Sequence, residues 1–314
     1  MASTEAVPTF KLNTGASIPA IGLGTWQSDP GEVTKAVECA LDAGYKHIDC
    51  AFCYQNEDEV GEGLKTFFSK QDKVKREDVF ITSKIWCTYH SRVNEAVDLS
   101  LKALGVDYLD LYLMHWPCPM NPKGSHPLFP KHPDGSRDLD SSWTWQQTYK
   151  DMEKLLATGK VKAIGVANFS KPYLEELLKV CTVTPAVNQI ENHPYLPQQE
   201  IVDYCHENGI HVTSYSPLGS TGAPLMKDEA VISIAKKHNV HPVTVLLSWH
   251  FARGNSVLSK STNPVIIASN LKLVTLDKEE VDELQQLHVK KGLKRFVFPP
   301  FGPDFGFPDT KKTS

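Results

Sequence analysis

The sequence lacks the features that mark several large classes of protein. No apolar run in its 314 residues approaches the ~18 residues of a membrane-spanning helix, so we expect no membrane partner. No basic start followed by an apolar stretch opens the chain, so we expect no secretory signal. The seven cysteines are too few, and odd in number, for a disulfide scaffold, which predicts reduced thiols and a cytoplasmic location.

Neither sign of charge is in large excess. Lysine plus arginine number 33 and aspartate plus glutamate number 37, which gives a formal net charge of −4. An isoelectric point near 6.3 indicates that nucleic acid is not a partner. Hydrophobic residues make up 41% and charged residues 22%, as in ordinary globular proteins. The length suits two medium domains or one large α/β barrel.

Several catalytic and binding motifs are also missing. There is no Gly-x-Ser-x-Gly turn of an α/β-hydrolase and no carboxylate pair of a glycosidase. A Gly-x-Gly-x-x-Gly motif is absent too, because Gln27 stands where the third glycine after Gly22 and Gly24 belongs. This difference argues against a dinucleotide site of the Rossmann type.

Metal chemistry has little support in the sequence. No His-x-His pair stands at the end of a predicted strand, which disfavours a metal-dependent barrel hydrolase. Cys50 and Cys53 have Cys-x-x-Cys spacing, but no second such pair completes a zinc site. A redox pair favours a helix start, whereas these cysteines follow a strand-like run. We expect these cysteines to be packing residues, and we expect no bound metal.

Apolar periodicity predicts alternating strands and helices. Eight short apolar runs predict strands at 21–25, 47–50, 79–84, 109–115, 163–167, 186–190, 212–215 and 257–259. Amphipathic stretches predict helices at 31–43, 56–68, 91–104, 145–157, 171–179, 197–208, 228–238, 242–253 and 264–270. Eight strand–helix units predict an α/β fold, a closed (β/α)8 TIM barrel, as one domain over residues 1–314.

Three segments lie outside this alternation. Residues 9–18 alternate around Asn13, Thr14 and Gly15, which predicts a β-hairpin that plugs the bottom of the barrel. Residues 117–142 are rich in proline and follow a strand, so they predict a long loop at the active-site face. Residues 296–314 carry prolines and several phenylalanines, and these aromatic side chains predict a tail that packs rather than a disordered one.

Polar side chains stand at the ends of three adjacent predicted strands. Asp49 ends the second strand, Lys84 the third and His115 the fourth, and Tyr54 follows Asp49 by five residues. Each alone is ordinarily a cap, a satisfied core group or a rim charge. Because the carboxyl ends of barrel strands meet at one mouth, we expect the four to lie close together.

Together these groups suit proton donation to a developing alkoxide. A phenol with an ordinary pKa of about 10 is a poor acid at pH 7. The sequence predicts that the Lys84 ammonium lowers the pKa of Tyr54, while Asp49 holds Lys84 charged and in place. His115 can hydrogen-bond the substrate oxygen and orient it. An alkoxide develops when hydride adds to a carbonyl group, which predicts an oxidoreductase.

Motifs in a fixed order resemble the aldo-keto reductase family over essentially the whole chain. They lie at residues 22–26, 47–57, 81–86, 110–117, 164–170, 187–189, 215–219 and 259–261. Asp49, Tyr54, Lys84 and His115 match the family's catalytic set, and the resemblance implies that Tyr54 is the general acid. The segment 50–57 is most similar to fungal glycerol dehydrogenases and aldose reductases.

The resemblance also implies an extended NADP(H) across the barrel mouth. Its implied contacts are Thr25 and Asp49 near the nicotinamide ribose, Asn168 and Gln189 at the carboxamide, Tyr215 on the ring, Ser216, Leu218 and Gly219 at the pyrophosphate, Lys260 and Ser261 at the 2′-phosphate, and Asn270 at the adenine. A cation with a hydroxyl suits a dianion, and an aromatic face suits a flat ring.

Two positions depart from the family pattern. Ala167 stands where the family usually has serine, which removes one carboxamide contact. Ile266 stands where an arginine meets the 2′-phosphate, which removes a bidentate partner worth roughly 1.5–3 kcal/mol. We therefore favour NADP(H) through Lys260 and leave NAD(H) open.

The resemblance implies an aromatic pocket for a small carbonyl substrate. Trp26, Trp86 and Trp116 are expected to wall it, with His115 touching the substrate. Such a pocket suits aromatic aldehydes, small ketones and polyol-related carbonyls such as glyceraldehyde. The alternative is a non-catalytic nucleotide-binding barrel that acts as a regulatory subunit. We expect a monomer or a weak homo-oligomer.

Overall fold

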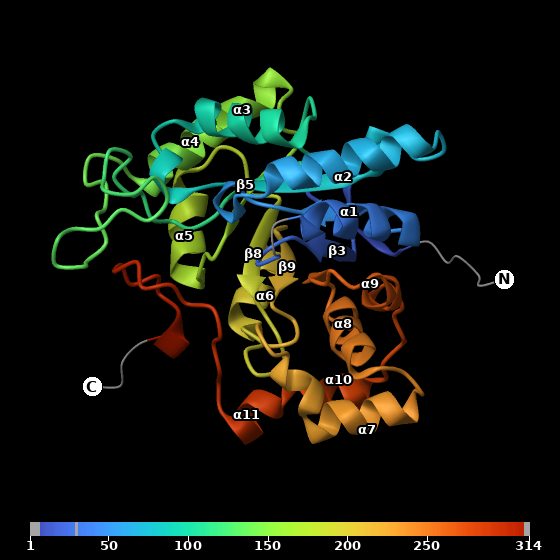
Figure 1. Ribbon diagram of the computed structural model, residues 1–314. Helices are drawn as coiled ribbons and strands as arrows, with labels where there is room; N and C mark the ends of the chain where they lie inside the picture. Colours follow the sequence, from blue (N-terminus) through green and yellow to red (C-terminus); the bar gives the residue numbers. More distant parts are fainter. Residues whose placement is uncertain (1–6, 29–30, 311–314) are drawn as a thin grey trace.

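The computed structural model describes residues 7–28 and 31–310. Its centre is a closed barrel in the order β10-β3-β4-β5-β6-β7-β8-β9, with every neighbouring pair parallel. The strands are β3 (Ile21–Gly24), β4 (His47–Asp49), β5 (Phe80–Ile85), β6 (Leu111–Met114), β7 (Ile164–Ala167), β8 (Val187–Glu191), β9 (His211–Tyr215) and β10 (Ser256–Ser259). The predicted (β/α)8 TIM barrel is confirmed (Figure 1).

Helices follow the strands as the periodicity predicts. They are α1 (Glu32–Ala43), α2 (Glu57–Lys70), α3 (Val93–Leu104), α4 (Trp145–Leu155), α5 (Lys171–Val180), α6 (Gln199–Glu207), α7 (Glu229–Lys237), α8 (Pro242–Ala252) and α9 (Pro264–Asn270). Their apolar stripes pack on strands that are buried on both faces, which is why those strands are almost continuously apolar. Gly44 ends α1 with a positive φ of 108°, and its amide donates to the carbonyl of Ala40.

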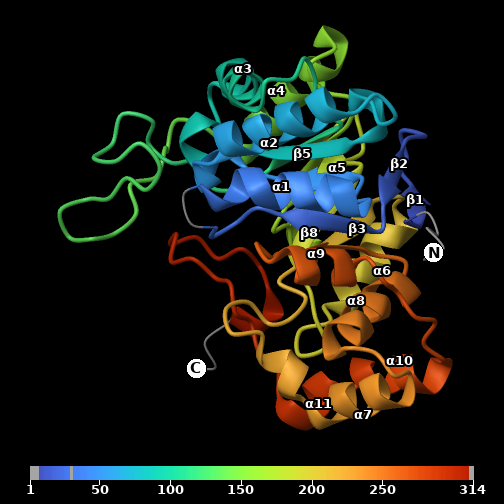
Figure 2. The ribbon, with the colours of Figure 1, turned by 45° about the vertical axis from the view of Figure 1, so that its right-hand side comes forward.

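Two further helices were missed by the sequence analysis. α10 (Lys278–Gln285) and α11 (Leu287–Lys291) lie beside α7, at the lower edge of Figures 1 and 2. Val281 and Leu284 are the only apolar residues of α10, too few to define a period in the sequence. A capping box between Asp277 and Glu280 marks its start and was the available signal.

A hairpin closes the bottom of the barrel, as predicted. β1 (Thr9–Lys11) and β2 (Ser17–Pro19) pair antiparallel. Leu12 and Ile18 are buried and pack with Phe80 and Leu111, which begin β5 and β6. In Figure 2 this hairpin lies at one end of the barrel, and the long loop and the C-terminal tail lie at the other.

Residues 117–142 form the predicted long loop. Of the predicted packed tail, residues 296–310 are described and pack as expected, and residues 311–314 lie outside the described residues. Within the loop, the structure has only the isolated bridges Met120–Leu139 and Lys131–Arg137. In the tail, Phe301, Phe305 and Phe307 are almost completely buried. Burial of these rings explains why a proline-rich segment is fixed over the barrel mouth.

No helix among residues 7–28 and 31–310 combines the length and the apolar character that crossing a bilayer requires.

Candidate active site

The four predicted polar residues meet at the carboxyl ends of β4, β5 and β6. Asp49 is the last residue of β4, Lys84 lies one residue before the end of β5, and His115 directly follows β6. Tyr54 ends a short 3-10 helix, η1 (Phe52–Tyr54), in the connection between β4 and α2. Adjacent parallel strands deliver these side chains to one place because their carboxyl ends share an edge.

A buried ion pair lies at the base of this group. The Lys84 ammonium donates to Asp49 Oδ1 at 2.6 Å and to the carbonyl of Cys50 at 2.8 Å. The other Asp49 oxygen accepts from Gln189 Nε2 at 2.8 Å. Burial raises the pKa of Asp49, and the Lys84 charge and these hydrogen bonds oppose that rise. The lysine is thus fixed by two consecutive residues at the end of β4, and Gln189 on β8 holds the carboxylate of one of them.

Tyr54 lies above this pair, and its acidity differs from the expectation. The Lys84 nitrogen is 5.1 Å from the centre of the Tyr54 ring. Burial, reinforced by the negative charge of Asp49, raises the pKa of Tyr54 well above 10. The prediction that Lys84 lowers this pKa is therefore wrong for the protein alone, because desolvation outweighs a cation already neutralised by Asp49. The phenol keeps its proton at all physiological pH values.

His115 is neutral and faces Tyr54. Its ring lies 5.7 Å from that of Tyr54, centre to centre. Burial lowers the pKa of His115 well below 6.5, with the Lys84 charge acting in the same direction. Asn168 Nδ2 donates to the His115 carbonyl at 2.8 Å, which fixes the backbone after β6.

Cys53 is a site residue that the sequence analysis treated only as packing. Its sulfur lies 3.5 Å from His115 Nδ1. Burial raises the pKa of Cys53, so the thiol keeps its proton and can donate to Nδ1. In that arrangement the neutral imidazole carries its own proton on Nε2. The position of Cys53 directly before Tyr54 was the available signal.

The residues expected around a nicotinamide surround the same four groups. The Tyr215 hydroxyl donates to Asn168 Oδ1 at 2.7 Å. Thr25 Oγ1 donates to the Asp49 carbonyl at 3.1 Å. Together with the bond between Gln189 and Asp49, these contacts place the expected carboxamide and ribose residues beside the buried ion pair.

The residues expected at the pyrophosphate belong to the turn after β9. Ser216 and Gly219 have positive φ values of 53° and 86°. A Cβ atom on Gly219 would lie 2.4 Å from Leu225 Cδ1, so no side chain fits there. Leu218 is half-buried in the same turn. Gln27 connects this turn to Lys260, since its side chain accepts from Thr221 at 3.5 Å and its carbonyl from Lys260 at 3.1 Å.

The residues expected at the adenosine end of NADP(H) fit that part of the cofactor only partly. Lys260 is exposed, and Ser261 Oγ accepts from the backbone of Asn263. Asn270 is buried, and its Oδ1 has no hydrogen-bond partner among the described residues. An unpartnered acceptor fits a ligand that brings an N–H donor, as adenine does. Ile266 is 45% exposed and offers a phosphate no charge.

The three expected tryptophans differ in exposure. Trp26 is 46% exposed and packs on Tyr54 with ring centres 4.8 Å apart. Trp86 is buried against His115, and its Nε1 donates to the Leu128 carbonyl at 2.7 Å. Trp116 is buried against Phe301. The expected open aromatic wall is therefore Trp26, while the other two tryptophans hold the long loop and the tail in place.

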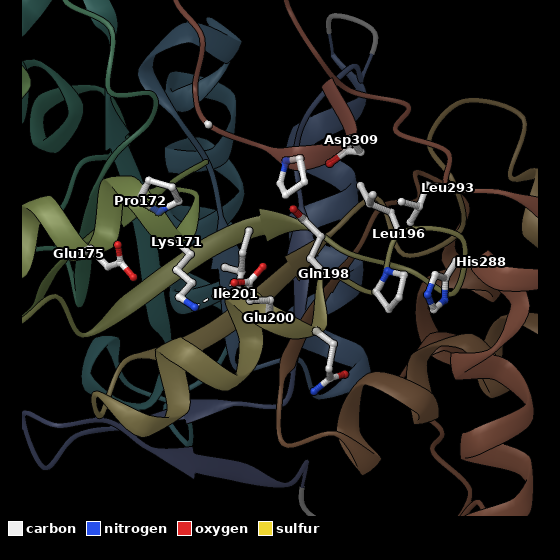
Figure 3. Close-up of a pocket in the computed structure, with 14 residues that line it drawn as sticks. Lys171, Pro172, Glu175, Leu196, Gln198, Glu200, Ile201, His288, Leu293 and Asp309 are labelled. Atoms are coloured by element: carbon white, nitrogen blue, oxygen red, sulfur yellow. Dashed lines mark hydrogen bonds and ion pairs between the residues drawn. The ribbon is translucent and has the colours of Figure 1, made fainter. Parts of the chain in front are cut away.

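A separate pocket of about 460 Å³ lies where α5, α6 and the tail meet (Figure 3). Lys171 and Glu200 form an ion pair of 2.9 Å in its wall, and His288 and Asp309 also line it. None of the expected site residues lines this pocket. Across the part of the chain that the structure describes, no three His, Cys, Asp or Glu side chains gather into a group that could hold a metal ion.

Known proteins resemble this chain over nearly its full length. D-galacturonate reductase of Hypocrea jecorina is 58% identical over 305 residues, covering 96% of this chain and 98% of the relative. Glycerol 2-dehydrogenase (NADP(+)) of Saccharomyces cerevisiae is 47% identical over 306 residues, covering 95% and 96%. The structure of the aldose reductase from Schistosoma japonicum superimposes with a TM-score of 0.86 at 40% identity, covering 92% and 94%.

The family model described as "Aldo/keto reductase family" matches residues 20–289. This range contains all eight barrel strands and every residue of the candidate active site. The resemblance drawn from the sequence motifs is confirmed, and the chain belongs to the aldo/keto reductase family.

Proposed function

We propose that this protein reduces aldehydes and ketones to alcohols with a nicotinamide cofactor, and that Tyr54 is the general acid. The observation that carries the proposal is the convergence of Asp49, Lys84, Tyr54 and His115 at one end of the barrel. Family membership and the names of the relatives support carbonyl reduction as the activity.

The protonation states of this group suit proton donation. The raised pKa of Tyr54 keeps a proton on the phenol, and an alkoxide is more basic than a phenolate, so transfer to the alkoxide is downhill. Lys84 lies close enough to stabilise the phenolate that remains. Asp49 keeps that ammonium from moving away.

His115 is suited to orient the substrate. Its lowered pKa keeps the imidazole neutral, so it can donate a hydrogen bond to the carbonyl oxygen without adding a charge. When bound, the nicotinamide supplies the hydride for the carbonyl carbon. Asn168, Gln189 and Tyr215 are the residues we propose to hold its carboxamide and ring.

We propose NADPH as the favoured cofactor. Lys260 and Ser261 follow β10 directly and can meet a 2′-phosphate with a cation and a hydroxyl. The yeast relative is named for NADP(+). Ile266 limits the preference, because no guanidinium stands on this face of α9 at that position.

We propose small polyol-related or aromatic aldehydes as substrates. The relatives are named for D-galacturonate and for glycerol, both of which are polyhydroxylated. Trp26 offers an exposed aromatic face beside Tyr54 for an apolar group.

The seven cysteines form no disulfide, which supports a reducing compartment such as the cytoplasm.

Substitution of Tyr54 tests the proposal. The wild type should oxidise NADPH with glyceraldehyde, an aromatic aldehyde or D-galacturonate. Tyr54→Phe removes only the acidic hydroxyl, so kcat should fall by about 100- to 10,000-fold. Fluorescence titration should show NADPH affinity unchanged within about threefold.

Two outcomes contradict the proposal. Near-full activity of Tyr54→Phe removes the assignment of the general acid. Tight NADPH binding by the wild type without turnover of any carbonyl compound indicates the non-catalytic nucleotide-binding barrel instead.

A further inference from the structure

Glu191 places a buried carboxyl group at the barrel mouth that the proposed reaction does not use. It is the last residue of β8 and has no exposed surface. Both of its oxygens accept hydrogen bonds from the C-terminal tail, Oε1 from the amide of Phe296 at 2.7 Å and Oε2 from that of Val297 at 2.8 Å. His193 Nε2 lies 2.9 Å from the same Oε1. A side chain that ends a barrel strand therefore holds the backbone of the tail.

The backbone of Glu191 is tied to the tail as well. Gln198 Nε2 donates to the Glu191 carbonyl, and Gln198 Oε1 accepts from Arg295 Nη2 at 2.9 Å. Glu191 also stands in register with Tyr215, the last residue of β9. Residues 295–297 of the tail are thus bound to the strand beside the tyrosine that we propose for the nicotinamide ring.

The ring of Phe296 connects this anchor to the turn after β9. It packs on the His193 ring, with ring centres 5.2 Å apart. A Cβ atom on Gly219 would lie 3.1 Å from Phe296 Cε2, so the Phe296 ring fills the space beside the Gly219 backbone. The same Cβ atom would lie 2.4 Å from Leu225 and 2.9 Å from Pro224. Gly219 therefore packs against a ring of the tail as well as against residues of its own loop.

The shape of this turn matters for a ligand that is bound by its backbone. Ser216 and Gly219 have positive φ values of 53° and 86°. Such a conformation is uncommon for serine and persists where the surrounding structure holds it. Backbone N–H groups bind an anion only when they are directed toward it. Phe296 supports one side of the turn, and Glu191 fixes where Phe296 stands.

We propose that Glu191 is a positioning residue for the cofactor. By holding two amides of the tail, it seats Phe296 against the turn and keeps the turn in the shape that binds the pyrophosphate of NADPH. Glu191 acts through Phe296 and touches neither the cofactor nor the substrate. The inference rests on the proposed function and adds a role for the C-terminal tail in cofactor binding.

Substitutions at both ends of this link test the inference. Glu191→Gln keeps the size of the side chain and loses one of the two acceptor oxygens. Phe296→Ala removes the ring, and Phe296→Leu keeps part of its bulk. Phe296 is 38% exposed, so its variants should fold even if Glu191→Gln does not.

Tyr173→Phe provides the matched control. The Tyr173 hydroxyl, on α5, donates to the Asp304 carbonyl at 3.0 Å, which is a separate anchor of the tail. Its loss should loosen the tail without removing the Phe296 ring from the turn.

The expected effect is confined to cofactor binding. Fluorescence titration should show that the Kd for NADPH rises by about 3- to 30-fold in Glu191→Gln and in Phe296→Ala, and by less in Phe296→Leu. The KM for NADPH should follow the Kd, while kcat at saturating NADPH should fall by less than about threefold because Tyr54 and Lys84 are unchanged. The Tyr173→Phe control should change the Kd by less than about twofold.

The double variant shows whether the two residues act together. Glu191→Gln combined with Phe296→Ala should bind NADPH as tightly as the weaker single variant, within about twofold, because both substitutions break one link. Losses that multiply in the double variant mean that Glu191 does not act through Phe296, which contradicts the proposal.

Two further results overturn the inference. One is an unchanged Kd for NADPH in Phe296→Ala, and the other is an equal loss of affinity in Tyr173→Phe, which means that any loosening of the tail has the same effect. Failure of the proposed function looks different, because then the wild type itself reduces no carbonyl compound with NADPH.

Discussion

The two ends of the barrel are closed by opposite kinds of contact. At the bottom, the hairpin places Leu12 and Ile18 on apolar side chains at the starts of the strands. At the mouth, Asp49 and Lys84 form a charged pair that is as deeply buried as those hydrocarbons. Apolar closure stabilises the fold directly, whereas a buried pair needs each partner to compensate the desolvation of the other.

This difference separates stability from chemistry within one fold. A side chain at the bottom contributes through its volume, so its loss lowers stability and leaves the reaction groups in place. A charge at the mouth contributes to both the stability of the fold and the reaction, because removing it leaves an uncompensated partner beside the reaction centre. Substitutions at the two ends should therefore differ in their effects on stability and on turnover.

The largest combined effect is expected from Lys84→Met. The substitution leaves the Asp49 carboxylate buried without its counter-ion, so the free energy of unfolding should fall by about 3–5 kcal/mol. Turnover should fall as well, because the ammonium beside Tyr54 is gone. Urea denaturation and steady-state kinetics measure the two effects.

An exposed lysine provides the matched control for this substitution. Lys73→Met, away from the barrel mouth, should leave stability within about 0.5 kcal/mol and turnover unchanged. A stable, fully active Lys84→Met protein contradicts the role given to the ion pair.

At the bottom, Ile18→Ala should lower the free energy of unfolding by about 2–5 kcal/mol, because it leaves a cavity beneath the strands. Ile18→Val should cost only about 0.5–1.5 kcal/mol. The kcat per folded molecule should stay at the wild-type value in both. A selective loss of kcat in Ile18→Ala means that the two ends are coupled.

Buried histidines should make stability depend on pH. Burial lowers the pKa of His47 and of His211 to about 3, so the folded protein holds both rings neutral while the unfolded chain protonates them below about 6.5. Their contribution is therefore present above pH 6.5 and is lost as pH falls toward 3. At pH 5, each of these two histidines should lower the free energy of unfolding by about 2 kcal/mol.

Urea denaturation at pH 7 and pH 5 measures this loss. In His47→Gln, the difference between the two pH values should shrink by about 2 kcal/mol. The exposed His132 provides a control, since His132→Gln should leave the difference as in the wild type. An unchanged difference in His47→Gln contradicts the assignment.

The smallest effect is expected at the rim of the mouth, where solvent screens charges. The ratio of kcat/KM for NADPH to that for NADH should exceed one in the wild type, because Lys260 is present. Ile266→Arg should raise this ratio by about tenfold, as one added bidentate contact predicts. A wild-type ratio at or below one contradicts the proposed NADPH preference.

Local pattern was sufficient to predict most of the fold. Short apolar runs predicted the eight strands, period-3.6 apolar spacing predicted the helices that follow them, and alternation around Asn13-Thr14-Gly15 predicted the hairpin. It failed at α10, where Val281 and Leu284 are the only apolar residues and are too few to define a period. The positions of Asp49, Lys84 and His115 at strand ends were enough to predict that they lie close together, because the carboxyl ends of barrel strands meet at one mouth.

The pKa of Tyr54 and the contacts between side chains far apart in the sequence could not be predicted in this way. The direction of the Tyr54 pKa depends on how much water the folded mouth excludes and on whether the Lys84 charge is already compensated. The contact of Cys53 with His115 likewise depends on segments far apart in the chain.

The sequence by itself determined the barrel, its plug and the identity of the groups that meet at the mouth, since these follow from local spacing and from the direction of parallel strands. Only the tertiary structure decided which of those groups hold protons and which remote side chains contact them. Solvation and pairing are set by the packing of remote residues around each group, and a linear pattern does not contain that information.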